Sequence, residues 1–173
     1  MDIKDIRVFV CVPGVGKTWL ARHDDRFVDM DMLKAKYKYA QDDASDYEIE
    51  VLKGNRGQAV RKDANEYIER ITKEYLSGTD KILLFAPNPQ MVDMIYKNNI
   101  PYCLVYHSKD CVPEIAERMR ARGNQENFIE AMTLPIDEFY AASVNDKRPA
   151  FKIELFSGEF LSDKLLEIFS KQL

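Results

Sequence analysis

The sequence of 173 residues has few cysteines and histidines and no long hydrophobic run. Its three cysteines are too few and too odd in number for a disulfide framework, and Cys11 and Cys103 fall in apolar runs, as reduced core cysteines do. The two histidines, His23 and His107, lie far apart, which argues against a histidine-based zinc site. No apolar run reaches the ~18 residues that a membrane-spanning helix needs. The charged N-terminus leads directly into a strand, so we expect no signal peptide, a cytoplasmic location and no membrane partner.

Positive charge is also scarce, since 25 lysines and arginines face 29 acidic residues and the net charge is −4. That balance argues against general affinity for duplex nucleic acid, which needs a positive surface. A small basic pocket for one nucleotide or one strand end remains compatible with it. The length suits one domain spanning residues 1–173, and no repeat or linker divides the chain.

Apolar runs alternate with helical patterns along the chain, which predicts an α/β fold. The expected strands cover residues 6–11, 27–29, 82–86, 102–106 and 151–156. Three of these runs are continuously apolar, as in a parallel sheet covered by helices on both faces. Helices are expected at about 17–23, 57–76, 113–122, 125–132, 136–142 and 163–171, the last with Ser162 as its N-cap.

The most informative motif is a glycine-bearing turn that follows the first apolar run directly. It reads Val12-Pro13-Gly14-Val15-Gly16-Lys17-Thr18 and continues into Trp19. A turn of this kind at the start of a helix can hold phosphates with its backbone N–H groups, while a lysine reaches the β/γ oxygens. Thr18 is a natural Mg²⁺ ligand. The motif predicts binding of ATP and Mg²⁺, with an ordinary strand-to-helix turn as the alternative.

The nucleotide contacts predicted from this motif come from Pro13, Gly14, Val15, Gly16, Lys17, Thr18 and Trp19. The full signature has glycine six residues before the lysine, where this chain has Cys11. That departure leaves open whether catalysis is impaired.

Two carboxylates, Asp29 and Asp31, end the second expected strand. Residues two apart in an extended segment project to the same side, so both can face the phosphate loop. Phosphoryl transfer needs one group near Mg²⁺ and another that orients or deprotonates the acceptor. The alternative is a solvated strand end.

The loop together with Phe27-Val28-Asp29-Met30-Asp31 resembles the small P-loop kinases. These include the shikimate and nucleoside monophosphate kinases and the 5′-polynucleotide kinase domain, and short phage-encoded nucleotide kinases look most similar. The resemblance implies a three-layer P-loop NTPase fold with a five-stranded parallel sheet in the order 2-3-1-4-5. It also implies that Asp29 serves the metal and Asp31 the acceptor.

About fifty residues separate the second and third strands, more than a crossover requires. We interpret residues 32–79 as an insertion on the acceptor side, with a decorated surface helix pair as an equal alternative. Lys34 and Lys38, one helical turn apart, and Arg56 and Arg61 are minor candidates for an acceptor phosphate.

Three arginines, Arg118, Arg120 and Arg122, crowd one segment. On a helix Arg118 and Arg122 share a face. The segment resembles the lid of P-loop kinases, which implies that residues 113–133 form a lid and that Arg118 and Arg122 contact the transferred phosphoryl group. A solvated face that pairs with Glu114 and Glu117 explains the pattern equally well.

The sequence therefore predicts an enzyme, a kinase that transfers phosphate from ATP to a nucleotide or related small acceptor. Lys17, Asp31, Arg118 and Arg122 would be its catalytic residues, and Thr18 and Asp29 its metal ligands. Two alternatives stay open: a kinase acting on a nucleic-acid 5′ end or a modified base in DNA, and a module that binds or slowly hydrolyses nucleotide.

Overall fold

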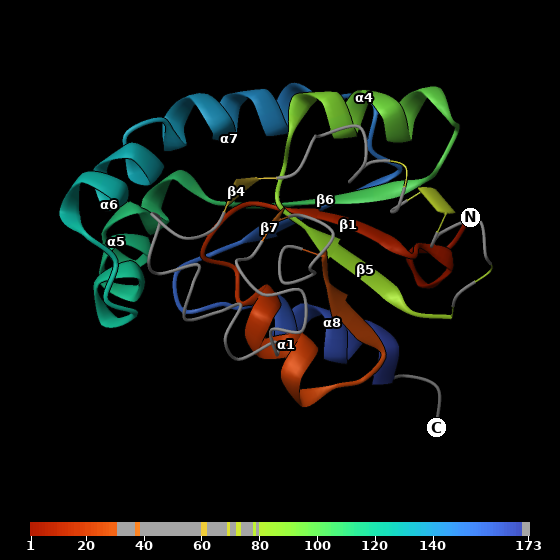
Figure 1. Cartoon of the computed structure of the whole chain (residues 1–173), viewed down its shortest axis with the longest axis horizontal. Helices are drawn as coiled ribbons and strands as arrows, with labels where there is room; N and C mark the ends of the chain where they lie inside the picture. Colours follow the sequence, from red (N-terminus) through yellow and green to blue (C-terminus); the bar gives the residue numbers. More distant parts are fainter. Residues whose placement is uncertain are drawn as a thin grey trace.

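The computed structural model describes residues 1–30, 37–38, 60–61, 69, 72–73, 78 and 80–170. Five parallel strands form its central sheet in the order β2-β5-β1-β6-β7, which confirms the predicted strand order (Figure 1). The strands are β1 (Val8–Cys11), β2 (Phe27–Asp29), β5 (Ile82–Phe85), β6 (Tyr102–His107) and β7 (Phe151–Leu155). Every residue of β1, β5 and β6 is buried, as expected for their apolar runs, and the burial includes the polar His107 that ends β6.

Helices cover both faces of the sheet (Figure 1). The α-helices are α1 (Lys17–His23), α4 (Pro89–Lys97), α5 (Val112–Ala121), α6 (Glu126–Thr133), α7 (Ile136–Asn145) and α8 (Leu161–Ser170). Two short 3₁₀ turns, η1 (Ile3–Asp5) and η3 (Lys109–Cys111), are also present.

Two apolar cores lie on opposite sides of the sheet. Side chains of α4, among them Ile95, pack with one set of strand residues, and Tyr140 of α7 adds to that core. Leu20 of α1 and Leu165 of α8 pack with the other set. Alternate residues of each central strand point to opposite faces, so one strand supplies both cores.

Helices α5 and α6 lie beyond the carboxyl ends of the strands (Figure 1). Their own apolar cluster includes Ile115, Met119 and Ile129. Arg120 of α5 pairs with Glu126 of α6 at 2.7 Å and links the two helices at the surface. The sequence therefore located both helices of the expected lid region to within about two residues.

The structure corrects the sequence analysis at several elements. Helix α8 begins at Leu161, two residues earlier than predicted, so Ser162 lies inside its first turn and is not the N-cap. Helix α4 was not predicted, although Asn88 caps it by accepting the N–H groups of Gln90 and Met91, and Pro89 occupies its first position.

The expected helix over residues 57–76 is also corrected in its first part. Val60–Arg61 forms strand β4, which pairs antiparallel with β3 (Tyr37–Lys38). Lys38 is therefore in a strand, and the helical spacing inferred for it does not apply. Glu69, Thr72 and Lys73, which belong to the same expected helix, are helical. Lys34 and Arg56 lie outside the described residues.

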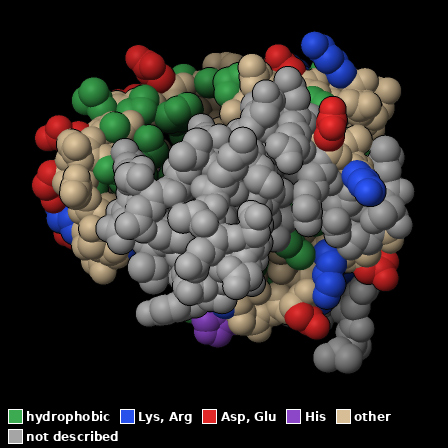
Figure 2. Space-filling view, in the orientation of Figure 1, with side chains coloured by type: hydrophobic (Ala, Val, Ile, Leu, Met, Phe, Trp, Pro, Cys, Tyr) green, Lys and Arg blue, Asp and Glu red, His purple; other side chains and the backbone are tan. Residues whose placement is uncertain are grey.

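The surface of the molecule carries exposed apolar side chains on α7 and on the link that precedes it. Figure 2 shows hydrophobic side chains gathered at the upper left, where Figure 1 draws α7. Leu134, Phe139 and Val144 of this part of the chain are large and exposed. In the described ranges, no helix is both long and apolar enough to cross a bilayer.

Candidate functional site

The predicted phosphate loop joins the end of β1 to the start of α1, at the carboxyl edge of the sheet. Gly14 and Gly16 both have left-handed backbone conformations, with φ of +87° and +94°, which residues with a Cβ rarely adopt. Gly16 is the N-cap of α1, and Lys17 is its first residue. The two glycines therefore let the chain reverse within a few residues of a buried strand.

The amide groups of this loop are available to a ligand. Within the part of the chain that the structure describes, no hydrogen bond uses the N–H of Gly14, Val15 or Gly16. Successive N–H groups in a segment with left-handed residues form a concave anion-binding site. The loop can thus receive an oxyanion without breaking an existing bond of these three amides.

Lys17 crosses the loop with its buried side chain. Its Nζ donates to the carbonyl oxygen of Cys11 at 3.3 Å, six residues earlier in the chain. An ammonium group has three donors, so this bond leaves capacity for phosphate oxygens. The side chain therefore closes the loop and places a positive charge at its mouth.

Cys11 itself ends β1 and is fully buried. Among the described residues other than glycine, Asn99 alone has a positive φ, so the backbone at Cys11 does not require glycine. Burial, with its thiol near the Phe9 carbonyl, accounts for a cysteine there. The departure from the full signature thus falls in the strand and leaves the turn unchanged.

Thr18 and Asp29 meet across the carboxyl edge of the sheet. The Thr18 hydroxyl donates to Oδ2 of Asp29 at 2.6 Å, and the Asp29 carboxylate is buried with 4% exposure. Both groups offer oxygen atoms, the ligands that Mg²⁺ prefers. The structure brings together the two residues predicted as metal ligands.

A larger metal cluster is not part of this arrangement. In the described residues, no three histidine, cysteine, aspartate or glutamate side chains gather closely enough to hold a metal ion. Mg²⁺ needs no such cluster, because it usually keeps several waters and takes one or two carboxylates together with phosphate oxygens. The Thr18–Asp29 pair therefore fits Mg²⁺ and does not fit a structural zinc site.

Asp31, the predicted acceptor-side base, lies outside the described residues. Trp19 is half exposed on α1 and stacks on His23, with ring centroids 4.1 Å apart and 15° between the planes. Trp19 and His23 are one helical turn apart, on the side of α1 that faces away from the core. The structure thus gives Trp19 an outer position beside the loop.

Arg118 approaches the loop through Phe160. Its guanidinium carbon lies 3.8 Å from the centre of the Phe160 ring, and its Nη2 donates to the Glu159 carbonyl oxygen at 3.2 Å. A Cβ added to Gly16 would lie 3.4 Å from Cδ1 of Phe160, so this ring borders the turn. Arg118 therefore approaches the loop indirectly, through its cation–π contact with Phe160, which borders Gly16.

Glu114 holds Arg118 and the segment before α8 in place. Its carboxylate accepts from the Arg118 guanidinium, from the Ser157 hydroxyl at 2.8 Å and from the Gly158 N–H at 2.8 Å. The Gly158 and Ser157 hydrogen bonds, and then Arg118, lower the pKa of Glu114. The pairing with Glu114 is the alternative that the sequence left open for Arg118, and it coexists with proximity to the loop.

The other two arginines have different surroundings. Arg120 pairs with Glu126 on the surface, and Arg122 is exposed where α5 ends. No ion pair of Arg122 occurs with another described residue. The structure therefore places Arg118 near the loop and Arg122 at the exposed end of α5.

His107 is a site residue that the sequence analysis missed. It ends β6, is buried, and its Nε2 lies 3.2 Å from the carbonyl oxygen of Pro13 in the loop. The sequence contained a signal, because the polar His107 directly follows the continuously apolar run 102–106, which was expected to form a strand beside β1. The sequence analysis considered this histidine only as a zinc ligand.

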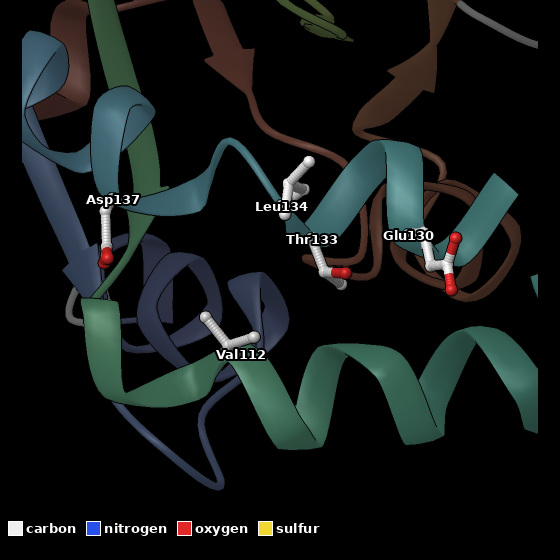
Figure 3. A pocket seen from close by; sticks show the side chains of 5 residues that line it. All are labelled: Val112, Glu130, Thr133, Leu134 and Asp137. Atoms are coloured by element: carbon white, nitrogen blue, oxygen red, sulfur yellow. The ribbon is translucent and has the colours of Figure 1, made fainter. Parts of the chain in front are cut away.

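A pocket of about 450 Å³ lies between α5, α6 and α7 (Figure 3). Val112 comes from α5, Glu130 and Thr133 from α6, Leu134 from the link and Asp137 from α7. Two carboxylates and no cationic side chain line it, which does not suit a phosphate group. None of the site residues predicted from the sequence lines this pocket.

Comparisons with known proteins give no family for this chain. No protein-family model and no curated protein matches it. A solved structure described as an uncharacterized protein from Eubacterium ventriosum ATCC 27560 is similar, with a TM-score of 0.47 and 14% sequence identity over 95% of this chain and 94% of that chain.

Proposed function

We propose that this chain is a P-loop kinase that transfers a phosphoryl group from ATP, with Mg²⁺, to a nucleotide or related small acceptor. One observation carries the proposal: three unused loop amides lie beside the buried Lys17 and the hydrogen-bonded Thr18 and Asp29. An anion site and an oxygen pair for a hard cation are the two halves of a metal–triphosphate site.

The loop would bind the phosphates of ATP. The N–H groups of Gly14, Val15 and Gly16 would donate to phosphate oxygens, and Lys17 would neutralise charge on the β and γ groups. These donors are fixed by the backbone before the reaction, so they stabilise developing charge without reorganisation.

Thr18 and Asp29 would hold Mg²⁺. The hydrogen bond between them orients the threonine hydroxyl and leaves oxygen lone pairs for the ion. When bound, Mg²⁺ supplies positive charge against the phosphate oxygens during transfer. Asp29 also keeps the threonine rotamer fixed, because the acid is buried and ends a short strand.

The acceptor side of the proposal depends on Asp31, Arg118 and Arg122. Asp31 would accept the proton of an acceptor hydroxyl or orient an acceptor phosphate. Arg118, held by Glu114 and Phe160, would supply a fixed positive charge near the loop. Arg122 would reach the transferred group from the end of α5.

The decisive experiment is a single-turnover assay with γ-labelled ATP and Mg²⁺. Nucleosides, nucleotides, small sugar and polyol acceptors, 5′-hydroxyl oligonucleotides and duplex DNA with modified bases form the panel. Label on a nucleotide or small molecule supports the proposal, whereas label on an oligonucleotide end or a DNA base indicates the nucleic-acid kinase. Label released only as free phosphate, or no turnover despite ATP binding, indicates the nucleotide-binding module.

A further inference from the structure

Two carbonyl groups of the phosphate loop each meet a donor from another element. The Val15 carbonyl accepts the N–H of Leu161, the first residue of α8, at 3.0 Å. The Pro13 carbonyl lies 3.2 Å from Nε2 of His107 at the end of β6. The loop is therefore held from two sides by parts of the chain that are remote in sequence.

These bonds bear on the amides that face the ligand. In a planar trans peptide unit, the C=O and the following N–H point in opposite directions. No described peptide bond is cis, so the Pro13 carbonyl and the Gly14 N–H obey this rule. A donor that holds the Pro13 oxygen toward the end of β6 thus directs the Gly14 N–H away from β6.

His107 is fitted closely beneath this peptide unit. Its side chain is 6% exposed, and a Cβ added to Gly14 would lie 3.6 Å from its Nε2 and 3.5 Å from Cγ2 of Ile115. The backbone of His107 is fixed independently, because it continues the pairing of β6 with β7. The imidazole has little freedom to turn away from Pro13.

The protonation of His107 agrees with a donor at Nε2. A carbonyl oxygen only accepts hydrogen bonds, so Nε2 carries the hydrogen. Burial lowers the pKa of His107 to about 4 against the raising effect of the Pro13 bond, with Arg118 and Lys17 lowering it and Glu114 raising it. At neutral pH the ring is an uncharged donor.

We propose that His107 is a positioning residue of the phosphate site: its Nε2–H holds the Pro13 carbonyl toward the end of β6 and so aims the Gly14 amide at the bound phosphates. This inference rests on the proposed nucleotide site. It differs from a packing role, because it requires the donor and the shape of the side chain together.

Two variants of similar length separate these roles. His107→Gln keeps an N–H donor near the position of Nε2, and His107→Met has a similar shape without one. Affinity for ATP and for inorganic tripolyphosphate is measured by calorimetry, since the amides act on phosphate and not on the base. We expect His107→Met to weaken both ligands roughly tenfold, as loss of one net hydrogen bond implies, and His107→Gln to stay within about threefold of the natural chain.

Tyr102→Phe provides the matched control in the same strand. Tyr102 is buried at the other end of β6, and its hydroxyl is a buried polar group with no hydrogen-bond partner among the described residues. Removing that hydroxyl should leave ATP and tripolyphosphate affinity unchanged. A tenfold loss in this control would show that any change in β6 disturbs the loop and would overturn the specific role of His107.

The remaining outcomes also decide the matter. Equal losses in the glutamine and methionine variants, or no loss in either, overturn positioning while the natural chain still binds ATP. Absence of ATP binding by the natural chain rejects the proposed function and this inference together. If a variant does not fold, ¹⁵N imidazole spectra of the natural chain decide: hydrogen on Nε2 supports the role and hydrogen on Nδ1 alone refutes it.

Discussion

The hydroxyl of Thr18 donates a 2.6 Å hydrogen bond to the buried carboxylate of Asp29, eleven residues away in the sequence. This bond joins the first turn of α1 to the end of β2, although β5 separates β2 from β1 in the sheet. It places two oxygen-bearing side chains beside the phosphate loop. The predictions below follow from this relationship and from the loop.

Asp29→Asn should raise the Mg²⁺ concentration needed for half-maximal activity by about tenfold or more. The asparagine amide keeps an acceptor for the Thr18 hydroxyl but removes the negative charge. Hydrogen bonds to charged groups contribute roughly 1.5–3 kcal/mol. Metal titrations at saturating ATP measure the shift. Asp25→Asn, in the exposed turn before β2, is the control and should leave the Mg²⁺ titration unchanged. Equal weakening of ATP binding with and without Mg²⁺ would contradict a metal role for Asp29.

Lys17→Ala should lower kcat/KM by about 10²–10³-fold or more, because it removes a fixed positive charge from the transferred group. Steady-state assays with the identified acceptor measure this loss. Lys97→Ala, at the exposed end of α4, removes the same charge far from the loop in sequence and should have no effect. Undiminished activity in Lys17→Ala would remove the loop from the mechanism.

Asp31→Asn should reduce phosphoryl transfer by about 10²–10⁴-fold, the range for a general base, with ATP affinity nearly intact. The acceptor needs this carboxylate only when the acceptor oxygen attacks the phosphoryl group, so the substitution should lower kcat. Single-turnover rates and calorimetric ATP binding, measured on the same preparation, separate the two effects. Parallel loss of transfer and ATP binding would argue that Asp31 supports the nucleotide site.

Gly16→Ala should cost about 1–2 kcal/mol of stability and also weaken ATP binding, because φ at this position is +94°. Gly78→Ala is a matched control, since Gly78 has φ of +74° and open space around its Cα. Both variants should lose similar free energy of unfolding in urea titrations, but only Gly16→Ala should lose ATP affinity. Similar affinity losses in both would point to a general effect of stability.

The free energy of unfolding should fall as pH is lowered from about 6.5 to about 4, because His107 is protonated in the unfolded chain before it is protonated in the folded one. The unfolded state binds more protons in that window, so acid favours unfolding. The full effect is on the order of 3 kcal/mol. Urea titrations in half-unit pH steps measure it, and His107→Gln should remove this component. An identical pH profile in that variant would contradict the assignment to His107.

Acid should also weaken the fold through Glu114. The Gly158 and Ser157 hydrogen bonds hold the pKa of Glu114 below its ordinary value, so its contribution is present above the unfolded pKa and is lost as pH falls through the folded one. This carboxylate is partly exposed, and solvent screens the effect. A Glu114→Gln variant should therefore be less stable than the natural chain at neutral pH, and the difference should shrink as pH falls and Glu114 becomes protonated.

Much of the sheet was predictable because its strands are short apolar runs bounded by turn residues. Val8 to Cys11 and Ile82 to Phe85 have no polar member, and such runs can be stable only with helices on both sides. Helix α1 was predicted with its bounds because Gly16 must precede it and the motif fixes Lys17 as its start. Local sequence was sufficient wherever the residues of a strand or helix, and those next to it, determine where it begins and ends.

Contacts between remote segments were harder to predict. The pairing of β3 with β4 depends on tertiary context, and the apolar spacing around Val60 also fits a helix. The approach of Phe160 to Gly16 joins two turns that no local pattern relates. Helix α4 is a different case, because Asn88-Pro89 is a recognisable helix start that was interpreted only as the end of a strand.

The position of Trp19 gives the molecule a built-in optical reporter. It is the one tryptophan in the sequence, follows Thr18 directly, and is half exposed against the ring of His23. Its emission therefore originates from a single place, one residue beyond the hydroxyl proposed to face magnesium. Fluorescence titrations can consequently follow ligand arrival at the start of α1 without any attached dye, and can rank candidate nucleotides before an acceptor is known.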